Sequence, residues 1–209
     1  NRGHSSASVY EAVMLIKEYG FEFGIQLMIG LPGDSLETCI YSANEAVKLK
    51  PSLTRLYPTI VIDDTELLEM YRRGDYEPLS REEAISRTTA MYKILDDAGI
   101  TIMRVGLKST DIIGEGGSIN GGTYHPAFRQ LVEGRIARDK IEPQLERIAN
   151  ECSGDRTKVD VFSSPEWFSN AVGNNSENRK YFDEKYPELS IKFRVDEHLE
   201  SAEFTVSVK

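Results

Sequence analysis

Residues 21–35 read FEFGIQLMIGLPGDS, a dense apolar run that stops abruptly at a glycine-rich turn. The run from Phe21 to Ile29 has the composition of a strand that is covered on both faces, as in a parallel sheet. After the turn, apolar residues recur at helical spacing from Ser35 to Leu49, and Pro51 ends this helix. Strand, turn and helix in this order predict an α/β fold with parallel strands.

The same alternation continues on both sides of this unit. Ser8 and Glu11 have capping-box spacing, which predicts a helix over residues 8–19. We further expect a strand over residues 53–62, with Pro58 at its end or at a bulge, helices over 65–73 and 80–97, and a third strand over 100–107. Three helix-to-strand repeats predict right-handed parallel crossovers. The spacing fits part of a barrel and an open sheet equally.

Beyond residue 107 the pattern changes twice. Residues 108–122 are rich in Gly, Ser, Thr and Asn, which predicts a long loop of the functional or mobile kind. Helical spacing resumes at Pro126, and Pro143 is expected to begin a separate helix. After Gly154 we expect a strand, a helix and two half-exposed strands, over 158–162, 176–186, 191–195 and 204–208. The expected division is therefore a barrel part over 1–122, a helical connector over 123–153 and a small α+β module of β-α-β-β type over 154–209.

Composition limits the functions open to the chain. The 209 residues carry a net charge of −9, which argues against phosphate binding over the whole surface but not against a local basic patch. No apolar run reaches the length of a membrane span and no signal pattern opens the chain, so we expect a soluble, cytoplasmic protein without membrane contacts. Cys39 and Cys152 lie far apart, predicting two reduced core thiols and no metal site. The chain opens without Met, which suggests a part of a larger protein.

The turn from Gly30 to Gly33 is the first candidate for a binding site. Glycines at a strand-to-helix turn let a ligand approach the backbone, and parallel α/β folds bind ligands at the carboxyl ends of their strands. The alternative is a tight turn with a helix cap. The turn matches neither standard phosphate loop, and Asp34 at the helix start disfavours a bound phosphate.

Several segments, taken in order, resemble one family. They are Asn1-Arg2-Gly3-His4-Ser5, Gln26-Leu27-Met28-Ile29-Gly30-Leu31-Pro32-Gly33, Leu56-Tyr57-Pro58-Thr59-Ile60-Val61-Ile62, Gly74-Asp75-Tyr76-Glu77-Pro78 and Met103-Arg104-Val105. Together they resemble the later half of the radical domain in radical S-adenosylmethionine enzymes of the Elongator catalytic-subunit type, including the short bacterial forms. The resemblance covers roughly the first two-thirds of the chain; the final module resembles no family that we can name.

This resemblance implies the C-terminal part of a TIM-type barrel. Its N-terminal half, which would hold a 4Fe-4S cluster on three cysteines, precedes the chain, so the chain alone is expected to be inactive and to bind neither cofactor. The cluster would chelate S-adenosylmethionine, and reduction would yield a 5′-deoxyadenosyl radical. The implied cofactor contacts are Gln26, Gly30, Leu31, Pro32, Gly33, Tyr57 and Thr59. No metal ligand and no catalytic residue is assigned.

Substrate contacts are implied at two further places. Arg2 and His4 occupy the Arg-Gly-His-Thr position of the family, with Ser5 in place of Thr, and the alternative is an exposed chain end. Arg104 and Lys108 flank the exit of the third strand, where they could meet an acidic substrate or be solvated. The implied substrate is a transfer RNA uridine. No acetyl-coenzyme A loop is present, so we expect no acetyl transfer by this chain.

Two other interpretations stay open. The chain could be a non-catalytic module that docks a protein partner through its acidic surface and its final module. It could also be an unrelated α/β enzyme that uses residues 30–34 as an anion loop. An incomplete barrel would leave apolar strand edges that invite self-association.

Overall fold

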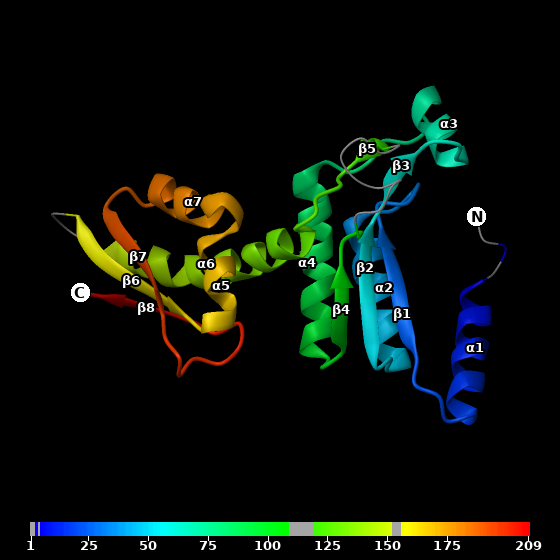
Figure 1. Ribbon diagram of the computed structural model, residues 1–209, viewed down its shortest axis with the longest axis horizontal. Helices are drawn as coiled ribbons and strands as arrows, with labels where there is room; N and C mark the ends of the chain where they lie inside the picture. The colour runs from blue at the N-terminus through cyan, green and yellow to red at the C-terminus, as the bar shows by residue number, and fades with distance from the viewer. Residues whose placement is uncertain (1–2, 4, 109–118, 152–155) are drawn as a thin grey trace. The chain divides into compact units, whose positions relative to one another are not determined.

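The computed structural model describes residues 3, 5–108, 119–151 and 156–209 (Figure 1). The chain divides into two compact units, residues 1–128 and residues 129–209. Each unit is built on its own three-stranded sheet. The predicted mixed α/β class is confirmed.

The sheet of the first unit is parallel, as the helix-to-strand alternation predicts. It contains β1 (Gly24–Ile29), β2 (Leu53–Pro58) and β4 (Thr101–Val105) in the order β1-β2-β4. The register places Gly24 opposite Leu53 and Leu53 opposite Thr101, and it shifts by a bulge between Thr54 and Arg55. Because all three strands run in the same direction, their carboxyl ends meet at one edge.

The helices of this unit are α1 (Ser6–Glu18), α2 (Leu36–Leu49), α3 (Glu66–Arg73) and α4 (Arg81–Asp97). Ser35 and Ser80 form capping boxes with Thr38 and Glu83, which fixes where α2 and α4 begin. The cap predicted at Ser8 is wrong, because the Ser5 hydroxyl accepts the Ser8 N–H and starts α1 earlier.

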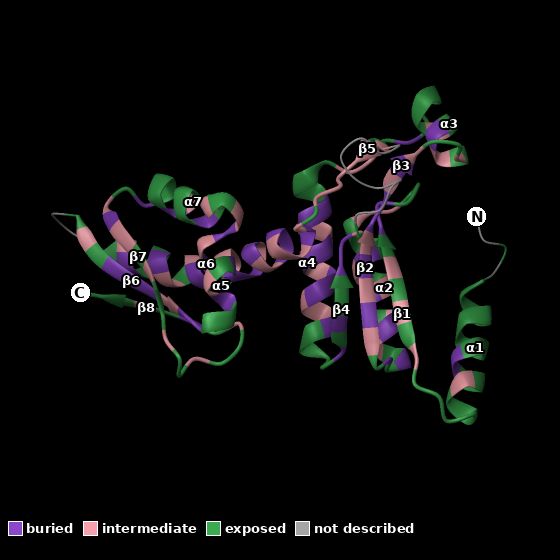
Figure 2. Cartoon of the chain, in the orientation of Figure 1, coloured by how far each residue is buried: buried purple, intermediate pink, exposed green. Residues whose placement is uncertain are grey.

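Among the described residues, helices α2 and α4 cover one face of the parallel sheet. Helices α2 and α4 pack on each other and against the strands, and they bury Ile29 and Leu56 completely. Figure 2 shows buried residues along α4 and an exposed surface over most of α1. The opposite face of the sheet has exposed side chains, so the expectation that β1 is covered on both faces is wrong for this chain.

A small antiparallel pair extends this unit beyond the parallel sheet. It joins β3 (Ile60–Ile62) to β5 (Ile119–Gly122), with Ile60 opposite Gly122. The single strand predicted over residues 53–62 is therefore two strands. They separate at Thr59, whose N–H donates to the Ile29 carbonyl after Pro58, which has no N–H to offer.

The second unit contains one long helix, α5 (Phe128–Glu151), which starts at the unit boundary. The prediction of a separate helix from Pro143 is wrong, because Pro143 lies inside α5. Buried residues recur at helical spacing on both sides of the proline: Ile136, Ala137, Ile141, Leu145 and Ile148. This continuous stripe holds the helix together despite the lost hydrogen bond.

The sheet of the second unit has the order β7-β6-β8. Strand β6 (Thr157–Ser163) lies in the middle, parallel to β7 (Leu189–Val195) and antiparallel to β8 (Phe204–Val208). Short helices connect β6 to β7, namely η1 (Pro165–Trp167), α6 (Phe168–Val172), η2 (Asn174–Ser176) and α7 (Glu177–Lys185). The sequence predicted only the last of these.

Helix α5 closes the outer edge of β8 with one side chain. Gln144 donates to the Phe204 carbonyl at 3.0 Å and accepts the Val206 N–H at 3.2 Å. An amide side chain that pairs with both groups of an edge strand protects that edge from other strands.

Candidate functional site

The turn from Gly30 to Gly33 follows β1 directly, at the carboxyl edge of the parallel sheet. Gly30 and Gly33 have φ angles of +85° and +78°, which residues with a Cβ atom rarely adopt. A Cβ atom on Gly30 would also lie 2.7 Å from Leu79 Cδ1, whereas one on Gly33 would meet open space. A side chain at position 30 would therefore need both an unusual backbone conformation and a shift of the Leu79 side chain.

Asp34 holds the turn in place from inside. Its carboxylate accepts the Gly30 N–H at 2.8 Å and the Ser35 N–H at 3.0 Å, and also the Thr38 hydroxyl and the Cys39 thiol. Burial by itself raises the pKa of Asp34, but these hydrogen bonds outweigh it and hold the pKa below the ordinary value of an aspartate. The ionised carboxylate is thus a structural part of the turn.

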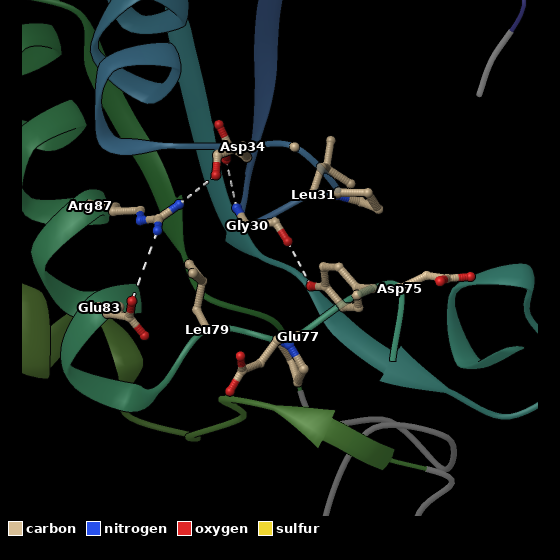
Figure 3. A pocket seen from close by; sticks show the side chains of 12 residues that line it. Gly30, Leu31, Asp34, Asp75, Glu77, Leu79, Glu83 and Arg87 are labelled. Atoms are coloured by element: carbon tan, nitrogen blue, oxygen red, sulfur yellow. Dashed lines mark hydrogen bonds and ion pairs between the residues drawn. The ribbon is translucent and has the colours of Figure 1, made fainter. Parts of the chain in front are cut away.

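Two side chains from later elements complete the clamp. The buried Tyr76 hydroxyl donates to the Gly30 carbonyl at 2.6 Å, and Arg87 of α4 donates to the Asp34 carbonyl at 3.0 Å. Figure 3 shows the Arg87 guanidinium between Asp34 and Glu83, whose carboxylate lies 4.0 Å away. Both backbone polar groups of Gly30 are consequently used within the protein, so contacts to a ligand fall to the exposed Leu31, Pro32 and Gly33.

A cavity of about 300 Å³ adjoins the turn. Its walls are Gly30, Leu31, Pro32, Gly33, Asp34, Asp75, Tyr76, Glu77, Pro78, Leu79, Glu83 and Arg87. Figure 3 shows that the α3–α4 connection and α4 supply the wall facing the turn. The sequence had marked Gly74 to Pro78 as a motif, but it gave no sign that this segment packs against the turn.

The open face of the parallel sheet lies next to the same edge. Gln26 and Met28 of β1 and Met103 and Arg104 of β4 are exposed there, and Tyr57 of β2 is half-buried. Met28 and Met103 leave 36% and 48% of their surface accessible. We call this surface, with these five residues, the open face.

Thr59 lies just beyond β2 and is 5% exposed. Within the part of the chain that the structure describes, its Oγ1 atom has no hydrogen-bond partner. A buried hydroxyl without a partner is costly, so this atom is suited to receive a polar group from outside the described residues.

The residues expected to form one site fall into two groups. Gly30 to Gly33 line the cavity, whereas Gln26, Tyr57 and Arg104 lie on the sheet, and Gln26 also borders a second cavity of about 460 Å³ against α1. Lys108 is exposed at the end of its described segment. Arg2 and His4 lie outside the described residues.

Cys39 is not suited to bind a metal. It is buried on α2, and burial together with the hydrogen bond to Asp34 raises the pKa of its thiol to about 12. Among the described residues, no group of three His, Cys, Asp or Glu side chains could hold a metal ion. Cys152 lies outside the described residues. No helix in the described ranges is both long and apolar enough to cross a membrane.

The parallel sheet, the glycine turn and the adjoining cavity are features of α/β domains in which ligands bind at the carboxyl ends of the strands. Comparison with known proteins makes this class specific. Residues 51–138 match the Radical_SAM C-terminal domain. These residues include β2, the α3–α4 wall of the cavity, α4 and β4.

Curated relatives agree with that match. The chain is 38% identical over 87 residues to a tRNA uridine(34) acetyltransferase of Methanocaldococcus jannaschii, covering 40% of this chain and 16% of that protein. It is 30% identical over 121 residues to human Elongator complex protein 3, covering 52% and 22%. The chain thus spans a minor part of the length of these relatives.

A solved structure, the archaeal Methanocaldococcus infernus Elp3 with an N-terminus deletion, is similar in fold. It has a TM-score of 0.56 and 27% identity, and covers 66% of this chain and 32% of that one. The predicted resemblance is confirmed: residues 51–138 match the radical S-adenosylmethionine C-terminal domain, and over its matched part the chain is similar to Elongator-protein-3-type proteins.

Proposed function

We propose that the first unit supplies the later strands of the barrel in a radical S-adenosylmethionine enzyme that acts on transfer RNA. The open face carries this proposal. In a β/α barrel the helices cover the outer face of the strands, and the inner face is turned toward the ligand. Here α2 and α4 cover one face of β1-β2-β4, while the other presents Gln26, Met28 and Tyr57. Further strands beside β1 and β4 would close the barrel around these residues.

In this arrangement the turn takes the nucleoside part of S-adenosylmethionine. Leu31, Pro32 and Gly33 would contact adenine and ribose, and Gln26 would offer a polar group from the strand below. Tyr57 and Thr59 would border the same space, Thr59 with its free Oγ1 atom. Gly30, clamped by Asp34 and Tyr76, would hold the turn rather than bind through its own polar groups.

The 4Fe-4S cluster must be held by residues other than those described. Cluster ligands are thiolates, and Cys39 is a buried thiol with a strongly raised pKa. The cluster, once bound with S-adenosylmethionine and reduced, supplies the 5′-deoxyadenosyl radical. The described residues contribute the walls of the barrel, so we expect this chain alone to be inactive.

The substrate side and the domain division are also proposals. Arg104 near the end of β4, together with Lys108, would face a phosphate of the transfer RNA. Arg2 and His4 would help to position the ribose or the substrate. The relatives named for tRNA uridine(34) support this substrate class. We retain the three parts 1–122, 123–153 and 154–209 as barrel part, connector and β-α-β-β module.

The test uses a longer protein that includes the residues preceding Asn1, purified without oxygen and reconstituted with iron and sulfide. We expect 5′-deoxyadenosine after addition of S-adenosylmethionine and a reductant. Met28→Trp would fill the open face and should abolish product, whereas Tyr41→Trp on the exposed side of α2 should leave product unchanged. Substitution of Gly30 is uninformative because of the Leu79 contact. Unchanged product from Met28→Trp would refute the placement.

A docking module is the second candidate, and one observation favours it. Met14, Leu15, Tyr19 and Phe21, on and just after α1, expose 64%, 54%, 71% and 68% of their surface. Contiguous exposed apolar side chains mark surfaces that bind another protein or segment. A reconstituted longer protein with no cluster and no product would favour this function.

A further inference from the structure

No described element of the second unit covers the other face of its sheet, and the proposed function does not use this uncovered face. Strand β6 lies between β7 and β8, so the pairing register shows which residues of the three strands lie side by side on this face. Asp160 lies opposite Lys192 of β7, and Phe162 lies opposite Arg194. On the other face Val159 and Val161 are 1% exposed, and the helices between β6 and β7 pack there.

The uncovered face concentrates positive charge in an acidic chain. Lys158, Lys192, Arg194 and Lys209 are all exposed, and the Lys209 N–H donates to the Lys158 carbonyl at 3.0 Å, which fixes these two residues opposite each other. The register thus places four cations on the same face as Asp160, on a protein whose net charge is −9. Such a patch attracts a polyanion although the whole protein repels one.

Asp160 organises two of these cations. Its Oδ2 atom lies 2.7 Å from Arg194 Nε and 3.2 Å from Lys209 Nζ, and the residue is only 4% exposed beneath them. Pairing through Nε leaves the two terminal nitrogens of the guanidinium as donors, and the ammonium keeps two of its three protons for other partners. Among the described residues, Lys158 and Lys192 have no carboxylate partner.

Phe162 adds an aromatic side chain to the same face. It is half-buried on the central strand, opposite Arg194 on one side and Thr205 on the other. Aromatic side chains on a sheet, flanked by cations, stack on unpaired bases while the cations hold phosphates. A flat sheet cannot enter the deep, narrow major groove of a paired RNA helix.

We propose that this face of the β7-β6-β8 sheet binds single-stranded RNA, with Lys158, Lys192, Arg194 and Lys209 on phosphates and Phe162 stacked on a base. The occupant is chosen by charge complementarity and by the central aromatic residue. This inference is independent of the proposed function, because it involves neither S-adenosylmethionine nor a cluster.

The test is fluorescence anisotropy of the 209-residue chain with a labelled single-stranded RNA of about 10 nucleotides at low salt. We expect binding whose logarithm falls with the logarithm of salt concentration with a slope of about −3, as four phosphate contacts predict. Lys158→Glu/Lys192→Glu should weaken binding at least about tenfold and reduce the slope by about half.

Matched variants separate charge from stacking. Arg147→Glu/Lys180→Glu changes the charge equally on exposed positions of α5 and α7, and should change affinity less than about twofold. Phe162→Leu should weaken binding at least about fivefold with the salt slope unchanged. Thermal melting confirms that each variant folds.

Four results would overturn the proposal. They are an absence of RNA binding by the unaltered chain, an equal loss from the helix variant, full affinity in Phe162→Leu, and competition by polyglutamate as effective as competition by unlabelled RNA. The last result would identify the face as a site for an acidic protein. None of them would bear on 5′-deoxyadenosine formation by the longer protein.

Discussion

The two sheets of this protein share a plan but differ in their uncovered faces. Each has three strands and one face packed by helices. The open face of the first unit carries Met28, Met103 and Tyr57 beside Gln26 and one cation, Arg104, whereas the uncovered face of the second carries four cations, Lys158, Lys192, Arg194 and Lys209. Apolar side chains gain free energy when another surface covers them, and charged ones lose it. The apolar part of the first face is therefore suited to be covered by further chain, and the second face to stay in water until an anion binds there.

The largest effect on stability should come from truncating a buried side chain in one unit while the core of the other unit stays intact. Phe182 of α7 is completely buried, so Phe182→Ala should destabilise the second unit by about 3–5 kcal/mol. Hydrogen exchange should then show lost protection in residues 156–209 and retained protection in β1, β2 and β4. Leu56→Ala, also in a fully buried position, should give the reverse pattern. Uniform loss of protection in both variants would show that the two units unfold together.

The next effect concerns the clamp of the glycine turn. Asp34→Ala leaves the Gly30 N–H without its acceptor and the Ser35 N–H with Thr38 alone, and should cost about 1–3 kcal/mol in the free energy of unfolding at pH 7. Because the folded pKa of Asp34 is lowered, this contribution is complete above the unfolded value of about 3.9 and is lost as the pH falls through the folded pKa. Urea titrations from neutral to acidic pH should therefore show the two proteins converging. A difference in the free energy of unfolding between the two proteins that persists at low pH would contradict the role of the ionised carboxylate.

A smaller effect is expected on self-association, which compares the two uncovered faces directly. Met28→Lys on the open face should weaken any self-association by about tenfold, since it removes apolar surface from the contact. Lys192→Met makes the reverse exchange on the other sheet and should strengthen self-association. Sedimentation velocity over a range of concentrations measures both. Identical behaviour of the two variants would show that neither face takes part.

The smallest expected effect concerns the reactivity of the Cys39 thiol. Cys39 is buried, donates to Asp34, and has a pKa of about 12, so its thiolate is scarce at neutral pH. Iodoacetamide at pH 7 should modify Cys39 much more slowly than after unfolding in urea, as followed by mass spectrometry of its peptide. Equal rates in the two states would show that α2 does not shield this thiol.

The sequence predicted the elements that have local signals. Capping boxes at Ser35 and Ser80, the glycine at position 74 and the apolar run before Gly30 located helices and strands within a few residues. The sequence-based prediction failed where contacts between residues far apart in the chain determine the structure. Pro143 stays inside a helix because buried residues on both sides of it hold α5 in place. Ser5 and Ser8 offer similar local chemistry, so local signals could not show that Ser5 is the cap of α1.

The candidate site was predicted in part for the same reason. The glycine turn is visible in the sequence, because glycine and proline define it locally. Its clamp is not visible, because Tyr76 and Arg87 reach it from 46 and 53 residues away. The basic face of the second sheet needed the register, since Lys158, Lys192 and Lys209 become neighbours only when β6 lies between β7 and β8.

The most direct test of the central claim is hydrogen exchange in the reconstituted longer protein, with and without S-adenosylmethionine. If the open face and its turn form the cofactor wall, the ligand should slow exchange in residues 24–33 and 53–59 and leave 157–163 and 189–195 unchanged. Unchanged exchange in β1 and its turn, with the ligand bound elsewhere, would contradict the claim.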